Sequence, residues 1–327
     1  MPVIDVHTHM LNREWFELLR NHGAPKYKVI TIEDGVEAVT SDGARFLTPT
    51  PPHYDYELRI KDMDDAKVDI AIVSLTAPNV YFGGEEISAK AAQIVNDQMA
   101  EAQSKWPDRI RWLASLPWEY PDKAVAELKR AHAKGAVGVM VIADIHGRHL
   151  TEPTFAPVWK AIDELSLPVL VHPTAPPGAD VLALNEFMLA SSVGFLFDTT
   201  LAIARMIYDG FFDTYPNLKI IAAHAGATIP YIIGRLDRLA EKRPKVINKI
   251  TRMPSEYLPQ IYFDAVCYRL DALKFCLDIV GAGNLMYGSD YPHSIGDMKG
   301  CLERVDGLPS EHVEAVRGKN AIRIFGL

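Results

Sequence analysis

The chain has 327 residues, a length that suits one large domain or two small ones, and 48% of its residues are hydrophobic, as in ordinary globular proteins. Its formal net charge of -8 disfavours nonspecific binding to nucleic acid or to an anionic membrane surface. The 3 cysteines have no CxxC spacing, which favours reduced thiols in a cytoplasmic protein over a disulfide framework. The chain lacks a signal-peptide pattern and an apolar run of about 18 residues, so we predict neither secretion nor a transmembrane helix.

Short apolar runs alternate with amphipathic stretches along the whole chain. The apolar runs are too short for helices and are rich in Val, Ile and Leu, which is typical of strands buried on both faces. These predicted strands cover residues 3–7, 70–75, 110–116, 137–142, 169–172, 220–224, 261–264 and 285–288. Helical patterns lie between them, at residues 87–105, 121–134, 155–165, 199–215, 229–242, 270–280 and 310–325.

Eight strands that alternate with helices indicate an α/β fold of the (β/α)8, or TIM, barrel type, built as a single domain over residues 1–327. A doubly wound open sheet is the alternative, but that fold normally has a Gly-rich phosphate-binding turn after its first strand. In this chain histidines follow the first strand instead, which favours the barrel.

Two segments interrupt the alternation. Residues 12–57 form an insertion after the first strand, in which the apolar runs 28–32 and 44–47 are predicted to pair as a small hairpin. Residues 173–198 are predicted to form a long loop after the fifth strand. Insertions at the C-terminal face of a barrel usually shape its active site, so we expect both segments to lie near the functional residues.

His7 and His9 end the first predicted strand. Side chains two residues apart on a strand point the same way, so the two imidazoles project together. Two neutral nitrogens that converge are what a divalent metal needs from its first ligands. An isolated His-x-His pair could equally be a surface or capping pair, so other residues have to decide.

Three more polar residues mark strand ends. His172 ends the fifth predicted strand, His224 ends the sixth, and Asp290 follows the eighth. A barrel brings the C-terminal ends of all its strands to one rim, where these residues would meet His7 and His9. Each could alone be a hydrogen-bonded core residue or a turn residue. Their coincidence at matching strand ends predicts a metal site.

The remaining histidines are interpreted by their surroundings. His293 lies near the proposed rim, where it could contact a substrate or orient a ligand. The others lie in predicted helices or loops, and we expect them to be exposed to solvent: His22, His53, His132, His146, His149 and His312.

At these residues the chain resembles the amidohydrolase superfamily, and within it the branch of nonoxidative decarboxylases typified by 2-amino-3-carboxymuconate-6-semialdehyde decarboxylase. The resemblance covers essentially the whole chain. The motifs that carry it are Asp5-Val6-His7-Thr8-His9, Val171-His172-Pro173, Ala223-His224-Ala225-Gly226 and Gly288-Ser289-Asp290-Tyr291-Pro292.

The resemblance implies a role for each of the five residues. His7, His9, His172 and Asp290 match positions that hold a single divalent metal, usually zinc, although the sequence does not separate zinc from manganese. His224 matches the residue that orients or deprotonates water at the metal, so His224 and Asp290 are the predicted catalytic residues. Dinuclear relatives carry a lysine at the end of the fourth strand, and its absence from residues 138–144 favours one metal per chain.

The predicted substrate pocket departs from the family pattern. An arginine that binds substrate carboxylate in the family corresponds here to Leu47, and Arg45, two residues away, is the candidate to replace it. A tryptophan of the family's pocket is replaced by Ser191, and a phenylalanine by His293. Arg243 matches an arginine that reaches across a dimer interface, so a homodimer is expected, although the residue could also be a solvated surface charge.

These observations predict a metal-dependent nonoxidative decarboxylase, a carbon-carbon lyase, of a small aromatic or muconate-like carboxylic acid. Arg45, Arg243 and His293 are the predicted substrate-binding residues. The alternative is a metal-dependent hydrolase or hydratase that acts on a lactone, amide or unsaturated acid. A barrel that binds a ligand without catalysis is a third hypothesis, and the intact set of metal residues argues against it.

Overall fold

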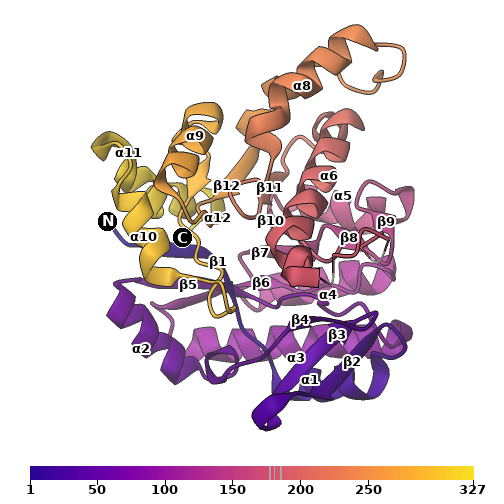
Figure 1. Cartoon of the computed structure of the whole chain (residues 1–327), viewed down its shortest axis with the longest axis vertical. Helices are drawn as coiled ribbons and strands as arrows, with labels where there is room; N and C mark the ends of the chain where they lie inside the picture. The colour runs from indigo at the N-terminus through magenta and orange to yellow at the C-terminus, as the bar shows by residue number, and fades with distance from the viewer. Residues whose placement is uncertain (177, 180, 185) are drawn as a thin grey trace.

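Eight parallel strands form the centre of the molecule, surrounded by helices (Figure 1). The computed structural model describes residues 1–327 except 177, 180 and 185. The strands lie side by side in chain order: β1 (Ile4–His9), β5 (Ile70–Ser74), β6 (Ile110–Ala114), β7 (Gly138–Ile142), β10 (Pro168–His172), β11 (Lys219–Ala222), β12 (Ile261–Asp264) and β13 (Leu285–Met286). This order confirms the predicted barrel.

The barrel is closed between its last and first strands by the segment that follows β13. Val6 N–H donates to the Tyr287 carbonyl at 3.0 Å, Asp290 N–H donates to the His7 carbonyl at 2.8 Å, and His9 N–H donates to the Tyr291 carbonyl at 2.7 Å. The same few residues therefore complete the barrel and carry the predicted metal ligands.

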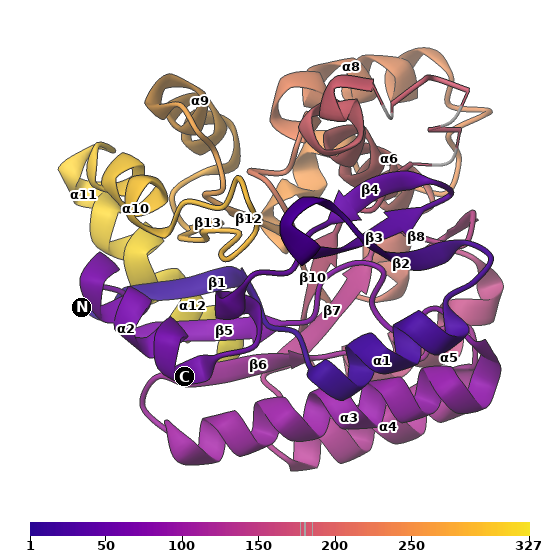
Figure 2. The ribbon, with the colours of Figure 1, turned by 60° about the horizontal axis from the view of Figure 1, so that its bottom comes forward.

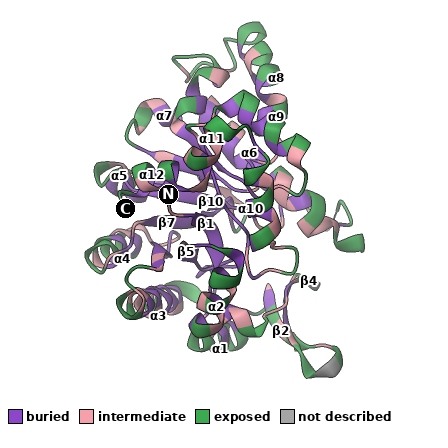
Figure 3. Cartoon of the chain, turned by 90° about the vertical axis from the view of Figure 1, so that its left-hand side faces the viewer, coloured by how far each residue is buried: buried purple, intermediate pink, exposed green. Residues whose placement is uncertain are grey.

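Helices surround the strands, and the face of each helix that packs against the strands is buried (Figure 3). In α3, for example, Ala91, Val95, Met99 and Ala102 recur at helical spacing and are all buried. The helices that follow strands are α3 (Gly84–Lys105), α4 (Pro121–Ala133), α5 (Ala156–Glu164), α6 (Phe195–Tyr208), α7 (Phe211–Thr214), α8 (Ile229–Lys242), α9 (Leu270–Val280), α10 (Met298–Asp306), α11 (Ser310–Glu314) and α12 (Asn320–Phe325).

The insertion between β1 and β5 differs from the predicted hairpin. It contains α1 (Arg13–His22) and a three-stranded antiparallel sheet of β2 (Tyr27–Thr31), β3 (Glu37–Ser41) and β4 (Ala44–Leu47), and it leads into α2 (Tyr56–Ala66) (Figure 2). The two runs predicted to pair with each other pair instead with β3, which lies between them. β3 was missed because Glu37, Thr40 and Ser41 interrupt its apolar character. A short hairpin of β8 (Asp144–Ile145) and β9 (Arg148–His149) approaches this sheet, with the Tyr27 and His146 ring centroids 6.4 Å apart.

The region after β10 also differs from prediction. The expected loop 173–198 includes a 3-10 turn η4 (Glu186–Met188), a π turn η5 (Ala190–Gly194) and the start of α6. The helix predicted over 199–215 is broken between α6 and α7 because Gly210 adopts φ 68°, which is outside the helical region.

By length and composition alone, the helical stretch Glu186–Tyr208 is apolar enough to cross a membrane, contrary to the sequence-based expectation. A third of its apolar window is buried inside the molecule. The buried residues of α6 include Ile203 and Ile207. The outer face exposes Phe197 and Leu201. α6 thus occupies the position of an ordinary barrel helix and leaves an apolar outer face.

Candidate metal centre

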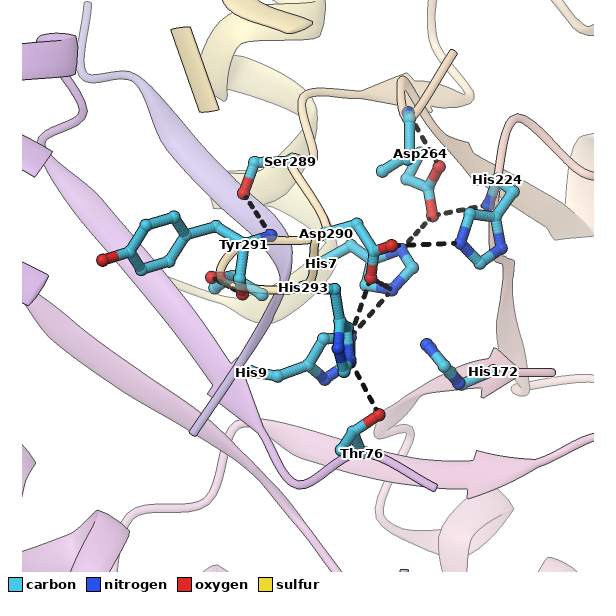
Figure 4. A network of polar contacts seen from close by, with 12 residues as sticks. His7, His9, Thr76, His172, His224, Asp264, Ser289, Asp290, Tyr291 and His293 are labelled. Carbon is cyan, nitrogen blue, oxygen red and sulfur yellow. Dashed lines mark hydrogen bonds and ion pairs between the residues drawn. The ribbon is translucent and has the colours of Figure 1, made fainter. Parts of the chain in front are cut away.

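The structure brings the five predicted metal and catalytic residues together at the C-terminal rim of the barrel (Figure 4). His7 and His9 project from the end of β1, and His172 projects from the end of β10. His224 lies two residues beyond β11, and Asp290 lies beyond β13. His7 Nε2 lies 3.1 Å from His9 Nε2, and Asp290 Oδ1 lies 3.4 Å and 3.2 Å from these two nitrogens. His224 Nε2 lies 3.6 Å from Asp290 Oδ2.

Hydrogen bonds at the far side of each ring decide which nitrogen faces the centre. His7 Nδ1 donates to the Asp264 carboxylate at 2.7 Å, His9 Nδ1 to the Leu75 carbonyl at 3.3 Å, and His172 Nδ1 to the Pro173 carbonyl at 2.8 Å. Because a carboxylate and a carbonyl cannot donate, Nδ1 of His7 and Nδ1 of His172 each carry a proton, and Nε2 of each ring faces the centre. His9 Nδ1 also lies 3.1 Å from the Ser74 hydroxyl, which can donate or accept.

The donor set fits a divalent cation. Three imidazole rings and a carboxylate converge, and these are nitrogen and oxygen donors that a divalent metal accepts. His172 Nε2 and His224 Nδ1 are buried without a hydrogen-bond partner among the described residues. Burial lowers the pKa of His9 to about 3 and that of His172 well below its usual range, so both are neutral, as metal ligation requires. Although burial opposes its protonation, Asp264 and Asp290 raise the pKa of His7 to about 10, so a metal would displace a proton from this ring. Burial opposes ionisation of Asp290, but the His224, His7 and His9 rings hold its pKa well below the usual range.

Asp264, at the end of β12, orients two parts of the site although the sequence suggested no role for it. Its carboxylate accepts the hydrogen bond from His7 and also accepts bonds from the backbone N–H groups of His224 and Ala225, each at 3.0 Å. Although burial opposes its ionisation, the neighbouring His7 lowers the pKa of Asp264. Its position at a strand end, like that of the other site residues, was the signal that could have identified it.

The turns that carry His224 and Asp290 have strained backbones. His224 has φ 57°, Ala225 φ 54° and Asp290 φ 57°, all in the left-handed region that residues with a Cβ rarely adopt. Buried Asp5 accepts hydrogen bonds from the backbone N–H groups of His7 and Ser289, which ties the Asp290 turn to β1. The fold therefore holds both predicted catalytic residues in conformations that the chain alone disfavours.

Arg59 on α2 is a second residue without a predicted role. Its guanidinium is fully buried, donates to Thr8 Oγ1 at 2.7 Å and to the His9 carbonyl, and lies 4.7 Å from the centre of the Tyr291 ring. It therefore contacts two of the segments that carry the metal residues, β1 and the segment after β13. The only sequence signal was a charged residue on the inner face of an amphipathic helix.

His293 lies beside the cluster, as expected from its position near the rim. Its ring centroid is 4.8 Å from that of His9, and its Nε2 lies 2.9 Å from Thr76 Oγ1. His53, which was expected to be exposed to solvent, is instead fully buried, with its ring 5.4 Å from that of His293. That expectation was wrong because His53 lies in an irregular segment, where no periodicity indicates which side chains face inward.

The other histidines lie away from the centre. His22, His132 and His146 are exposed as expected, whereas His149 and His312 are half-buried. None of these belongs to the groups of potential ligands formed by the described residues.

The two arginines predicted to bind substrate are not in contact with the metal residues in the described part of the chain. Arg45 is exposed on β4, whereas Leu47 on the same strand is buried in the core. Arg243 is exposed immediately after α8, at the end of the helix that projects farthest from the barrel (Figure 1). Ser191 is half-buried in η5, where its hydroxyl donates to the Met188 carbonyl.

Comparisons with known proteins agree with this geometry. The chain is 29% identical over 333 residues to 2-amino-3-carboxymuconate-6-semialdehyde decarboxylase of Dictyostelium discoideum, covering 99% of this chain and 91% of the relative. The crystal structure of 5-carboxyvanillate decarboxylase from Sphingomonas paucimobilis superposes with a TM-score of 0.87 at 25% identity, covering 100% and 99% of the two chains. The same enzyme from Novosphingobium aromaticivorans, solved with manganese and 4-hydroxy-3-methoxy-5-nitrobenzoic acid, has the same fold, with a TM-score of 0.84 at 24% identity over 100% and 96% of the chains. Residues 4–327 match the family described as Amidohydrolase, so the chain belongs to that family.

Proposed function

We propose that this chain is a metal-dependent nonoxidative decarboxylase of a small aromatic carboxylic acid. The observation that carries the proposal is that the three imidazole rings of His7, His9 and His172 lie together with the Asp290 carboxylate at the barrel rim, within two overlapping groups of potential ligands. The similarity to two decarboxylases over nearly the whole chain supports decarboxylation rather than hydrolysis.

His7, His9, His172 and Asp290 would hold the metal. A divalent cation bound there would supply Lewis-acid chemistry, because it would bind substrate oxygens and stabilise their negative charge. We propose zinc, one ion per chain, because His-rich sites with a carboxylate suit it, and manganese is the alternative. Metal analysis of the purified protein distinguishes the two ions.

His224 is the proposed proton carrier. In decarboxylation the bond between the ring carbon and the carboxylate breaks, carbon dioxide leaves, and the electron pair left on the ring carbon takes up a proton. His224 has one buried nitrogen without a partner among the described residues and another 3.6 Å from Asp290. Asp290 can stabilise the protonated imidazole, which makes His224 suitable to hold and move a proton at this carbon.

The experiment is a turnover assay on hydroxylated benzoic acids and muconate-like acids, with released carbon dioxide as the readout. We expect release by the parent protein and its loss in two variants for different reasons. His172→Ala should lose the stoichiometric metal, whereas His224→Gln should keep the metal and lose about 100-fold or more in kcat. Turnover of lactones or amides without carbon dioxide release would support a hydrolase instead. Stoichiometric metal in His172→Ala would overturn the ligand assignment.

The proposed substrate contacts are His293, Arg45 and Arg243. His293 is the one placed beside the metal residues. Arg45 lies in the insertion, and Arg243 would have to act on a second subunit because it lies at the far end of α8.

We further propose a homodimer formed through α6 and α8. Their outer surfaces expose large apolar side chains, including Phe197, Leu201, Tyr231 and Leu239, which is unusual for a free monomer surface. Sedimentation velocity should give twice the 36.4 kDa mass of the chain, and Tyr231→Glu should shift the protein toward the monomer. A monomeric parent at micromolar concentration would contradict this proposal.

A cytoplasmic location, with no nucleic-acid or membrane partner, completes the proposal. It is supported by the 3 free cysteines and the net charge of -8. Cell fractionation with an antibody against the native protein tests it, and recovery in the membrane fraction would contradict it.

A further inference from the structure

His53 is held against the metal-bearing strand by the backbone of the insertion. It is the last residue of η2 (Pro51–His53), and its side chain is fully buried. Its carbonyl accepts a hydrogen bond of 2.7 Å from the N–H of Leu11, two residues beyond His9. The ring therefore has a defined place relative to β1.

The hydrogen bonds of His53 also define its tautomer. The backbone N–H of Thr50 donates to His53 Nδ1 at 3.0 Å, and because a backbone N–H can only donate, the ring proton lies on Nε2. Burial, together with the neighbouring His293, His9 and Arg59, lowers the pKa of His53 to about 3, so the ring is neutral. Nε2 is buried without a hydrogen-bond partner among the described residues.

The aromatic neighbour of this ring is His293. The two ring centroids are 5.4 Å apart and the ring planes meet at 64°, in an edge-to-face arrangement. On other sides, His293 packs on His9 at 4.8 Å between centroids and places Nε2 2.9 Å from the Thr76 hydroxyl. Thr76 is itself buried, so three residues from separate segments confine one imidazole.

We propose that His53 is a positioning residue that fixes the ring orientation of His293 beside the metal residues. A neutral imidazole has one donor and one acceptor nitrogen, and rotation of the ring would move both to other positions. A His293 ring held in one orientation presents the same nitrogen to every substrate. The site can therefore favour a substrate with a hydroxyl facing this nitrogen over one with a methyl group there. This specificity role rests on the proposed function, whereas the coupling of the two rings does not.

The coupling is tested by side-chain 1H–15N correlation spectra of the zinc-loaded protein, with His293→Phe used to assign the His293 signals. In the parent we expect neutral, Nε2-protonated His53 and one sharp set of His293 signals, as a single ring orientation requires. In His53→Gln the His293 signals should shift or broaden because the ring can reorient, and the control His312→Gln, at a half-buried residue of α11 away from the centre, should leave them unchanged.

Two results would overturn the coupling: His53 protonated on Nδ1 in the parent, or His293 signals unaltered in His53→Gln. If His53→Gln does not fold, His53→Phe keeps the ring bulk without the Thr50 bond and is judged by the same criterion. The tautomer of His53 in the parent protein remains decisive in either case.

The specificity role is tested with 2-hydroxybenzoate and 2-methylbenzoate as probes. We expect His53→Gln to raise KM for the hydroxy acid about fivefold, the size of one neutral hydrogen bond, with the inhibition constant of the methyl acid and the metal content unchanged. Loss of metal with activity would show a merely structural role and overturn the proposal. Absence of turnover in the parent would refute the proposed function while leaving the spectroscopic result intact.

Discussion

At the scale of single residues, the centre depends on the groups behind the imidazoles as much as on the imidazoles themselves. The Asp264 carboxylate and the Pro173 carbonyl hold a proton on Nδ1 of His7 and of His172, so that Nε2 of each ring faces the centre. Of these acceptors only Asp264 is a side chain and carries charge. It is therefore the point at which mutation can test this arrangement without removing a ligand.

We expect Asp264→Asn to weaken zinc binding about 10- to 100-fold, because the amide no longer stabilises the Nδ1-protonated ring of His7 with a full charge. Competition with a chromogenic chelator measures the affinity. Asp271→Asn is the matched control, since Asp271 is an exposed carboxylate on α9 paired with Arg269. Equal zinc affinity in the parent and Asp264→Asn would show that the carboxylate does not support the site.

At the scale of elements, the turn after β11 combines the strained His224 with a glycine that admits no side chain. Gly226 has φ 71°, and a Cβ there would lie 2.3 Å from the Phe263 ring of β12. The close approach of this turn to β12 is also what allows Asp264 to bind the His224 and Ala225 amides. The turn and the strand therefore form one unit.

Gly226→Ala should destabilise the protein by more than the control Gly326→Ala. Both glycines have positive φ, which costs an L-residue about 1–2 kcal/mol, but a Cβ at Gly326 meets nothing within 4 Å. The excess in urea unfolding therefore measures the clash with Phe263, and the variant should also lose metal affinity. Equal destabilisation of the two variants would mean that the turn shifts away from Phe263 at no measurable cost in stability.

At the scale of the whole molecule, the metal should contribute to stability because it binds the folded chain and not the dispersed ligands of the unfolded one. At a free concentration 100 times the dissociation constant, such binding adds about 2.7 kcal/mol. Chelation should therefore lower the melting temperature of the parent protein measured by calorimetry. It should leave His172→Ala unchanged, and an equal decrease in both proteins would show that the chelator acts elsewhere.

Much of the barrel could be predicted because buried parallel strands appear as continuous Val, Ile and Leu runs, as in residues 138–142. The five rim residues were identifiable because they end such runs. His53 and β3 could not be predicted, since an irregular segment has no periodicity and the pattern of β3 is interrupted by Glu37 and Thr40. The break at Gly210 was missed because one glycine is tolerated in a helical pattern.

The closure of the barrel has a consequence for the order in which the protein can mature. His9 and Asp290 are 281 residues apart in sequence, and the backbone that carries Asp290 is also the seam joining the last strand to the first. During synthesis on the ribosome, His7 and His9 are made first, and the Asp290 carboxylate is added only when nearly all of the polypeptide is complete. A nascent chain arrested before Asp290 should therefore capture zinc weakly, and loading with metal should follow synthesis rather than guide it.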